Sequence, residues 1–172
     1  AGPMLALFLT LFELLRLRKG PAAIPYPWVL CLVVLTIWLV AGYAISLATE
    51  SMSDADFLNS TLAGVAGLAC YATVVVSSGH TPRLLQTITA ILGCGAVISI
   101  VYLVETVALG PLLGEPVTTL IAMLIVFWSV PVEGHIIARA INRHWYMGII
   151  VAMAVFIFQW YLYAFLNTDT AT

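Results

Sequence analysis

Five long apolar runs constrain the fold of this chain more than any other feature of its sequence. A helix needs about 20 mostly apolar residues to cross the hydrocarbon core of a bilayer. The runs cover Trp28–Thr49, Thr61–Ser78, Leu84–Leu109, Val117–Ile141 and Trp145–Leu166. Because the segments between them are short, consecutive helices should pack antiparallel. We therefore predict an all-α integral membrane protein built as a bundle of five transmembrane helices.

The composition agrees with this fold class. Charged residues make up only 8% of the 172 residues, whereas hydrophobic residues make up 63%. Soluble domains carry about 25% charged residues, so the composition excludes a water-soluble globular fold. The formal net charge is −2. Nucleic-acid binding depends on a surplus of basic residues, and we expect no nucleic-acid partner.

The segment before the first run, Met4–Lys19, is too short to cross a bilayer. Polar residues recur at every third position within it, namely Thr10, Glu13 and Arg16. This spacing predicts an amphipathic helix that lies in the membrane interface, or alternatively one that packs on a partner protein's membrane surface. We expect Ala1–Pro3 to be a cloning remnant and residues 4–172 to form a single membrane domain.

The basic residues set the predicted orientation, since Lys and Arg concentrate on the cytoplasmic side of membrane proteins. With the N-terminus inside and five crossings, all six fall on that side: Arg16, Arg18, Lys19, Arg83, Arg139 and Arg143. A change of one in the number of crossings would move the later arginines to the opposite side. We predict an N-in, C-out topology in which these side chains anchor the protein in the cytoplasmic headgroup layer.

The fourth run contains the residues that fit an apolar helix least well. Pro131 removes a backbone hydrogen bond and, together with Gly134, predicts a kink. Ionisable groups within a span are costly and are functional candidates by default. Glu133, His135 and Ser129 therefore form a candidate polar site or proton path. The alternative is that the two ionisable residues pair with neighbouring helices as packing contacts.

A polar stripe also follows helical spacing in this run. His135, Arg139 and Arg143 are four residues apart and share one helix face. Glu133 lies about 200° around the helix from His135 and faces elsewhere. The second acid within a run is Glu105, which we include among the candidate polar-site residues. Its place near the outer end of the third run leads us to expect that its side chain reaches the outer interface.

Three histidines map to the cytoplasmic side in this topology: His80, His135 and His144. Two histidines can hold a haem and three can hold a metal ion, so a haem- or metal-binding redox subunit is one alternative function. The histidines form no local ligand motif, and the spacing of the three cysteines matches no zinc or redox pattern. We therefore expect no metal and no cofactor.

Small residues within the runs predict close helix packing in lipid. The clearest are Gly64, Gly67, Gly93 and Gly95. The layout as a whole, an amphipathic cytoplasmic segment followed by five spans with the C-terminus outside, resembles that of Yip1-type membrane proteins. The resemblance is one of architecture and implies no site residues.

The sequence contains no phosphate-binding loop, nucleophile elbow or HExxH motif. We expect a non-enzymatic protein that acts by association, as an accessory or scaffolding subunit of a membrane assembly or in lipid and membrane organisation. Its partners would be the lipid bilayer and other membrane subunits or a second copy of itself. The alternative is a small transporter or a proton- or ion-conducting subunit that uses Glu133 and His135. Short loops and the lack of a cleavable signal pattern favour a bacterial cytoplasmic (inner) membrane.

Overall fold

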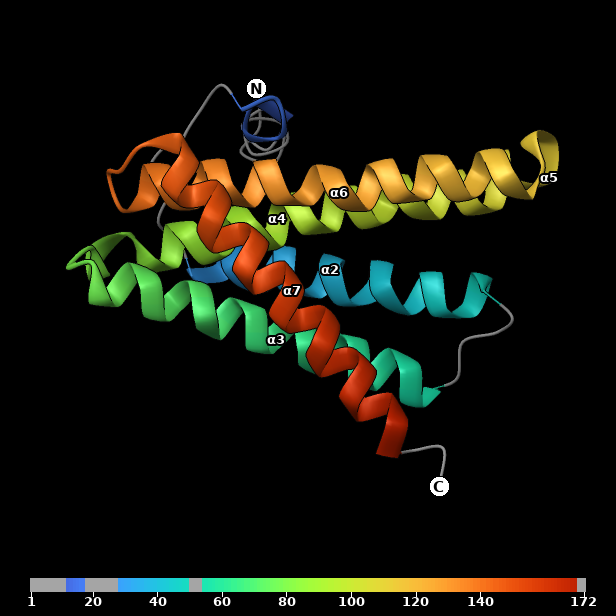
Figure 1. The fold of residues 1–172 in the computed structure, drawn as a ribbon, viewed down its shortest axis with the longest axis horizontal. Coiled ribbons are helices and arrows are strands. Elements are labelled where there is room, and N and C mark those ends of the chain that lie inside the picture. Colours follow the sequence, from blue (N-terminus) through green and yellow to red (C-terminus); the bar gives the residue numbers. More distant parts are fainter. Residues whose placement is uncertain (1–11, 18–27, 50–53, 170–172) are drawn as a thin grey trace.

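The computed structural model describes residues 12–17, 28–49 and 54–169. This part of the chain is helical, and five of its helices are long and apolar enough to cross a membrane. They are α2 (Trp28–Ala48), α3 (Asp54–Ser77), α4 (Leu84–Val104), α6 (Glu115–Ala140) and α7 (Trp145–Asp169). Figure 1 shows that successive helices run in opposite directions within one bundle. The arrangement fits an integral multi-pass membrane protein.

The second span begins earlier than the sequence predicts. α3 starts at Asp54, seven residues before the predicted start at Thr61. Asp54 and Asp56 lie in the first turn of α3, where the positive end of the helix dipole favours carboxylates. This polar turn carries no apolar signal, which is why hydropathy does not detect it.

The third span is longer than predicted because its helix continues through an irregular turn. A π-helical turn, η3 (Glu105–Leu109), leads directly into α5 (Gly110–Leu113). Gly114 then ends the helix with a φ of 77°, which glycine adopts without steric cost, and Glu115 already begins α6. Residues 110–116, which separate the third and fourth predicted runs, are thus helical except for Gly114.

Two helix ends at one end of the bundle share the same geometry. α3 is followed by Gly79 with a φ of 76°, and α6 by Asn142 with a φ of 55°. In both cases the next amide donates to a carbonyl five residues earlier, at 3.1 and 2.9 Å, which satisfies carbonyls left open at the helix end. Arg83, in the 3-10 turn η2 (Thr81–Arg83) that precedes α4, ties the two connections together by donating from Nη1 to Ala140 O at 3.2 Å. We call this the basic end of the bundle, after His80, Arg83, Arg139, Arg143 and His144.

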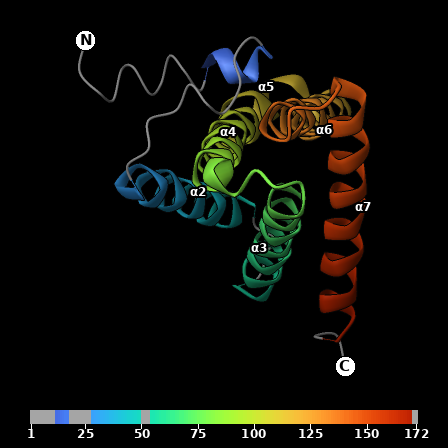
Figure 2. The same cartoon turned by 90° about the vertical axis from the view of Figure 1, so that its left-hand side faces the viewer.

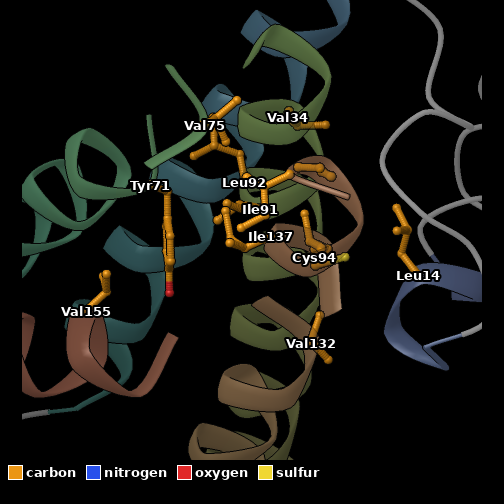
Figure 3. Packing of buried hydrophobic residues seen from close by; sticks show 14 residues of the cluster. Leu14, Val34, Tyr71, Val75, Ile91, Leu92, Cys94, Val132, Ile137 and Val155 are labelled. Atoms are coloured by element: carbon orange, nitrogen blue, oxygen red, sulfur yellow. The ribbon is translucent and has the colours of Figure 1, made fainter. Parts of the chain in front are cut away.

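α4 occupies the centre of the bundle, where it packs against α2 on one side and α6 on the other. α7 packs on α6 and on α3, and Figures 1 and 2 show it crossing the bundle at a steep angle. Figure 3 shows the buried apolar cluster between these helices. Its labelled residues are Leu14, Val34, Tyr71, Val75, Ile91, Leu92, Cys94, Val132, Ile137 and Val155.

Of the interfacial helix predicted at Met4–Lys19, the structure describes residues 12–17. Residues 12–15 are helical, and the backbone leaves the helix at Leu17 with a φ of 58°. Leu14 is fully buried in the apolar cluster, so this short segment packs against the protein. Three predictions fall outside the described residues, those for Ala1–Pro3, Arg18 and Lys19.

Glycines of α3 and α4 make room for large side chains of other helices. A Cβ on Gly64 would lie 2.8 Å from Cη2 of Trp38, and one on Gly95 would lie 3.5 Å from Nε1 of the same ring. Trp38 of α2 therefore occupies the space that Gly64 leaves, whereas a Cβ on Gly95 would make only an ordinary contact with the ring. Gly67 accommodates the Gln159 side chain of α7 in the same way. Gly93 is buried in α4.

Helices α6 and α7 approach each other closely at Gly134 and Gly148. A Cβ on Gly134 would lie 3.0 Å from the backbone N and Cα of Ile149, and one on Gly148 would overlap the carbonyl oxygen of Gly134. Gly134, predicted as part of a kink, is thus a packing contact. α6 continues as one helix through Pro131. Gly148 is not among the packing residues predicted from the sequence.

Candidate functional site

An open pocket of about 690 Å³ lies at the basic end, where α6 turns into α7. Its lining consists of Leu17, His135, Ala138, Arg139, Asn142, Arg143, His144 and Trp145. We call it the basic pocket. Two arginines and two histidines line it, and no acidic side chain belongs to the lining that the structure describes. The charge of the pocket therefore suits an anion.

Local backbone geometry brings these side chains together. His135, Arg139 and Arg143, predicted to share one helix face, all line the basic pocket. Asn142, in the left-handed conformation, reverses the chain so that His144 returns to the same pocket. His135 is only 7% exposed, whereas both arginines are exposed. The lining thus runs from a buried imidazole to exposed guanidinium groups at the surface.

Arg83 supports the pocket from outside. Its guanidinium donates from Nη1 to Ala140 O at 3.2 Å and to Arg139 O at 3.4 Å. These are among the last carbonyls of α6, which lack partners within the helix and form the negative end of its dipole. The Arg83 guanidinium is therefore hydrogen-bonded to the end of α6. The predicted contact of Arg83 with lipid headgroups must be compatible with these two bonds.

Aromatic rings surround the start of α7 beside the basic pocket. Trp145 and Tyr146 are each 57% exposed. The His144 ring stacks on Tyr146 with 5.6 Å between the ring centroids and 12° between the planes. Exposed Trp and Tyr side chains collect at headgroup depth in membranes, so this end of α7 has the chemistry of a membrane interface.

A second polar site is a small cavity of about 80 Å³ between the five long helices. Each of them contributes to its lining: Trp38 from α2, Gly64, Leu68 and Tyr71 from α3, Ile91, Leu92 and Gly95 from α4, Glu133 from α6, and Gln159 from α7. We call it the five-helix cavity. Tyr71, Glu133 and Gln159 bring a phenol, a carboxyl group and an amide to the lining, which is otherwise mainly apolar.

The strongest polar contact in this cavity joins α3 to α6. Tyr71, which is 1% exposed, donates from its hydroxyl to Oε2 of Glu133 at 2.5 Å. Figure 3 shows the Tyr71 hydroxyl directed away from Val75 and Leu92 of the cluster. This hydrogen bond links residues that are 62 positions apart in the sequence.

The polar residues predicted for the fourth span do not form a single site. Glu133 lines the five-helix cavity, whereas His135 lines the basic pocket. Ser129 is partly exposed and is not among the lining residues of either. The angular separation of Glu133 and His135 on the helix accounts for this division.

Glu105 contradicts the expectation that its side chain reaches the outer interface. It is 2% exposed, and neither carboxylate oxygen has a hydrogen-bond partner among the described residues. Glu105 is the first residue of the π-helical turn, which inserts one extra residue into the helix. The expectation rests on the place of Glu105 near the end of the run, and position along a helix does not specify which way a side chain faces.

The histidines do not converge on one metal site. Within residues 12–17, 28–49 and 54–169, no group of three His, Cys, Asp or Glu side chains is arranged to hold a metal ion. His135 and His144 line the basic pocket, whereas His80 lies 2.8 Å, through Nδ1, from the carbonyl oxygen of Ser78.

Six lining residues of the five-helix cavity are absent from the sequence predictions, and three of them, Gln159, Tyr71 and Trp38, carry polar atoms. Gln159 is an amide in the middle of an apolar run, and Tyr71 lies in mid-span rather than at an interface where aromatic rings collect. A polar amide in an apolar run and a tyrosine far from the interfaces can both be recognised in the sequence, so these two positions could have been singled out. Nothing in the sequence marks Trp38.

The basic pocket and the five-helix cavity are therefore two places in the described part of the chain where ionisable and polar side chains gather around a hollow. The basic pocket is lined mainly by one stretch of chain, residues 135–145. The five-helix cavity draws its residues from helices far apart in the sequence and exists only in the folded bundle. The likeness of layout to Yip1-type proteins carries no argument about either site. No protein-family model matches the chain, and no curated protein or solved structure matches it.

Proposed function

We propose that this protein is a non-enzymatic, multi-pass protein of a bacterial cytoplasmic membrane that organises lipid by binding the anionic headgroups of phospholipids in the basic pocket. The basic pocket is the observation that carries the proposal. Basic pockets between transmembrane helices on the cytoplasmic side bind anionic lipid headgroups. Such a protein would serve as an accessory subunit that holds lipid for a membrane assembly or arranges the lipid around itself.

The side chains of the pocket suit a phosphate group. The guanidinium groups of Arg139 and Arg143 can each bind phosphate through two parallel hydrogen bonds. The volume of about 690 Å³ lies within the usual range for small-molecule sites, roughly 300–1,000 Å³. Leu17 and Trp145 add apolar surface to the lining, which suits the glycerol and the first methylenes of a lipid.

Binding should depend on the two arginines. An anionic surface attracts each basic side chain by about 1 kcal/mol, so Arg139→Gln combined with Arg143→Gln should weaken binding of phosphatidylglycerol about 30-fold. The measurement is the thermal stabilisation of detergent-purified protein by phosphatidylglycerol relative to phosphatidylcholine, together with native mass spectrometry of the retained lipid.

Arg16→Gln is the control for general charge, because Arg16 is exposed and is not among the described lining residues. It should keep nearly the wild-type preference. Equal stabilisation of the wild type by both lipids would reject the proposal. An undiminished preference in the double variant would reject the basic pocket as the binding site.

The proposal requires the basic end to face the cytoplasm. Ser78 directly follows α3 and Glu115 begins α6, and Figure 1 shows these two helix ends at opposite ends of the bundle. Both residues are exposed, so each can be replaced by cysteine. A membrane-impermeant maleimide should label Glu115→Cys in intact cells and should label Ser78→Cys only after permeabilisation. The wild type, with its native cysteines, provides the background. The reverse labelling pattern would place the basic pocket in the outer leaflet and contradict the predicted topology.

A further inference from the structure

The five-helix cavity has a chemistry that lipid binding leaves unused. It brings one carboxyl group, one phenol and one carboxamide to a space of about 80 Å³ between apolar side chains. A water molecule takes up about 30 Å³ in the liquid. The space therefore suits a ligand the size of one ion with a water molecule, and is too small for an organic solute.

Among the described residues, no basic side chain, whether Lys, Arg or His, lines the cavity beside the carboxylate of Glu133. Tyr71 donates to Oε2 only, and no other hydrogen-bond partner of Glu133 occurs in the described part of the chain. A carboxylate in an apolar interior is strongly unfavourable unless a positive charge or a set of donors compensates it.

Further oxygen ligands are available beside the carboxylate. Gln159 donates from Nε2 to the carbonyl oxygen of Ala63 at 3.4 Å, which leaves its own carbonyl oxygen as an acceptor. The hydroxyl oxygen of Tyr71 keeps lone pairs after it donates to Glu133. Oxygen ligands of this kind suit hard cations.

We propose that the five-helix cavity binds a monovalent cation, either a proton or Na⁺, at the carboxylate of Glu133. Tyr71 and Gln159 act as the further ligands from α3 and α7. The site is independent of lipid binding, because it shares no described lining residue with the basic pocket. Bound cation would hold α3, α6 and α7 together at their common contact.

The titratable groups around Glu133 come from two other helices. Tyr71 of α3 is bonded to it, and the thiol of Cys94 of α4 interacts with it electrostatically. Cys70 of α3 interacts with Tyr71. α2 and α7 contribute Trp38 and Gln159, which do not titrate. A variant that keeps all of these groups and changes only Glu133 therefore isolates the contribution of the Glu133 carboxyl group to the effect of salt and pH on stability.

The test measures unfolding temperature in phosphatidylcholine nanodiscs. The wild type, Glu133→Gln and the control Glu115→Gln are compared in NaCl and in choline chloride at equal ionic strength, each from pH 5.5 to pH 8.5. Glu115 is exposed at the start of the same helix, so its substitution matches the charge change outside the cavity. A ligand at tenfold excess over its Kd should raise the wild-type unfolding temperature by about 3–6 °C.

The two cations give different results. If Na⁺ is the ligand, NaCl stabilises the wild type over choline chloride at fixed pH, and more strongly at high pH, where protons compete less. If the proton is the ligand, acidification stabilises the wild type relative to Glu133→Gln, and the choice of salt has no effect. The control should respond as the wild type does.

The proposal is overturned if the wild type and Glu133→Gln respond identically to both salt and pH. It is equally overturned if acidification destabilises the wild type relative to Glu133→Gln and Na⁺ has no effect. Should Glu133→Gln fail to fold, Gln159→Leu takes its place, because it removes one ligand and keeps the carboxylate. A reduced response in Gln159→Leu supports the site, and an unchanged response rejects it.

Discussion

Replacing Gly148 by leucine should separate α7 from α6 and destroy the folded bundle. A Cβ at this position would overlap the carbonyl oxygen of Gly134 and lie 2.8 Å from the Cβ and 2.9 Å from the backbone N of Ala138. Excess volume in a packed interior usually costs about 1–3 kcal/mol. Two of the obstructing atoms belong to the backbone of α6, which cannot rotate aside, so we expect Gly148→Leu to lower the free energy of unfolding by at least about 3 kcal/mol.

The measurement is the unfolding temperature in detergent, with size-exclusion chromatography to detect aggregation. Gly148→Ala and Gly42→Ala form a matched pair, because a Cβ on Gly42 would lie 3.5 Å from the Phe57 ring, an ordinary contact. Gly42→Ala should leave the unfolding temperature nearly unchanged, whereas Gly148→Ala should lower it clearly. Equal unfolding temperatures for the two alanine variants would show that α6 and α7 can separate there without cost.

Replacing Glu105 by leucine should stabilise the protein, although most substitutions at buried positions destabilise. The side chain is 2% exposed, and both carboxylate oxygens lack a hydrogen-bond partner among the described residues. Burying a polar group in this way costs about 1–3 kcal/mol. Leucine fills a similar volume without that cost, so the unfolding temperature should rise by about 3–10 °C.

Glu115→Leu provides the comparison, since Glu115 is exposed near the same end of the bundle. It should change the unfolding temperature by no more than a surface substitution does, within about 0.5 kcal/mol. A lower unfolding temperature in Glu105→Leu would show that the carboxyl group has a stabilising partner in the membrane. Glu105 would then be a candidate functional residue and not an unpaired buried acid.

The apolar runs predict the number and order of the long helices because hydropathy reports directly on burial in lipid. Their ends are predicted less well where the helix is polar or irregular. The turn at Asp54 lies beyond the apolar stretch and carries no hydropathy signal. The π-helical turn at Glu105–Leu109 depends on how α4 packs against its neighbours, which the local sequence does not specify.

The same distinction applies to the two polar sites. His135, Arg139 and Arg143 are neighbours on one helix, so their spacing alone predicts the stripe that becomes the basic pocket. Tyr71 and Glu133 are 62 positions apart, and their hydrogen bond depends on which helices meet. Spacing within one helix contains no such information, which explains why the five-helix cavity could not be predicted.

The single-residue connection at Gly114 has a consequence for the biosynthesis of this protein. Helices α4 and α6, with η3 and α5 between them, are joined with no slack. Neither helix can move far along its axis without drawing the other after it. We therefore expect the chain to enter the bilayer at this point as a preformed helical hairpin, with both spans delivered in one insertion event.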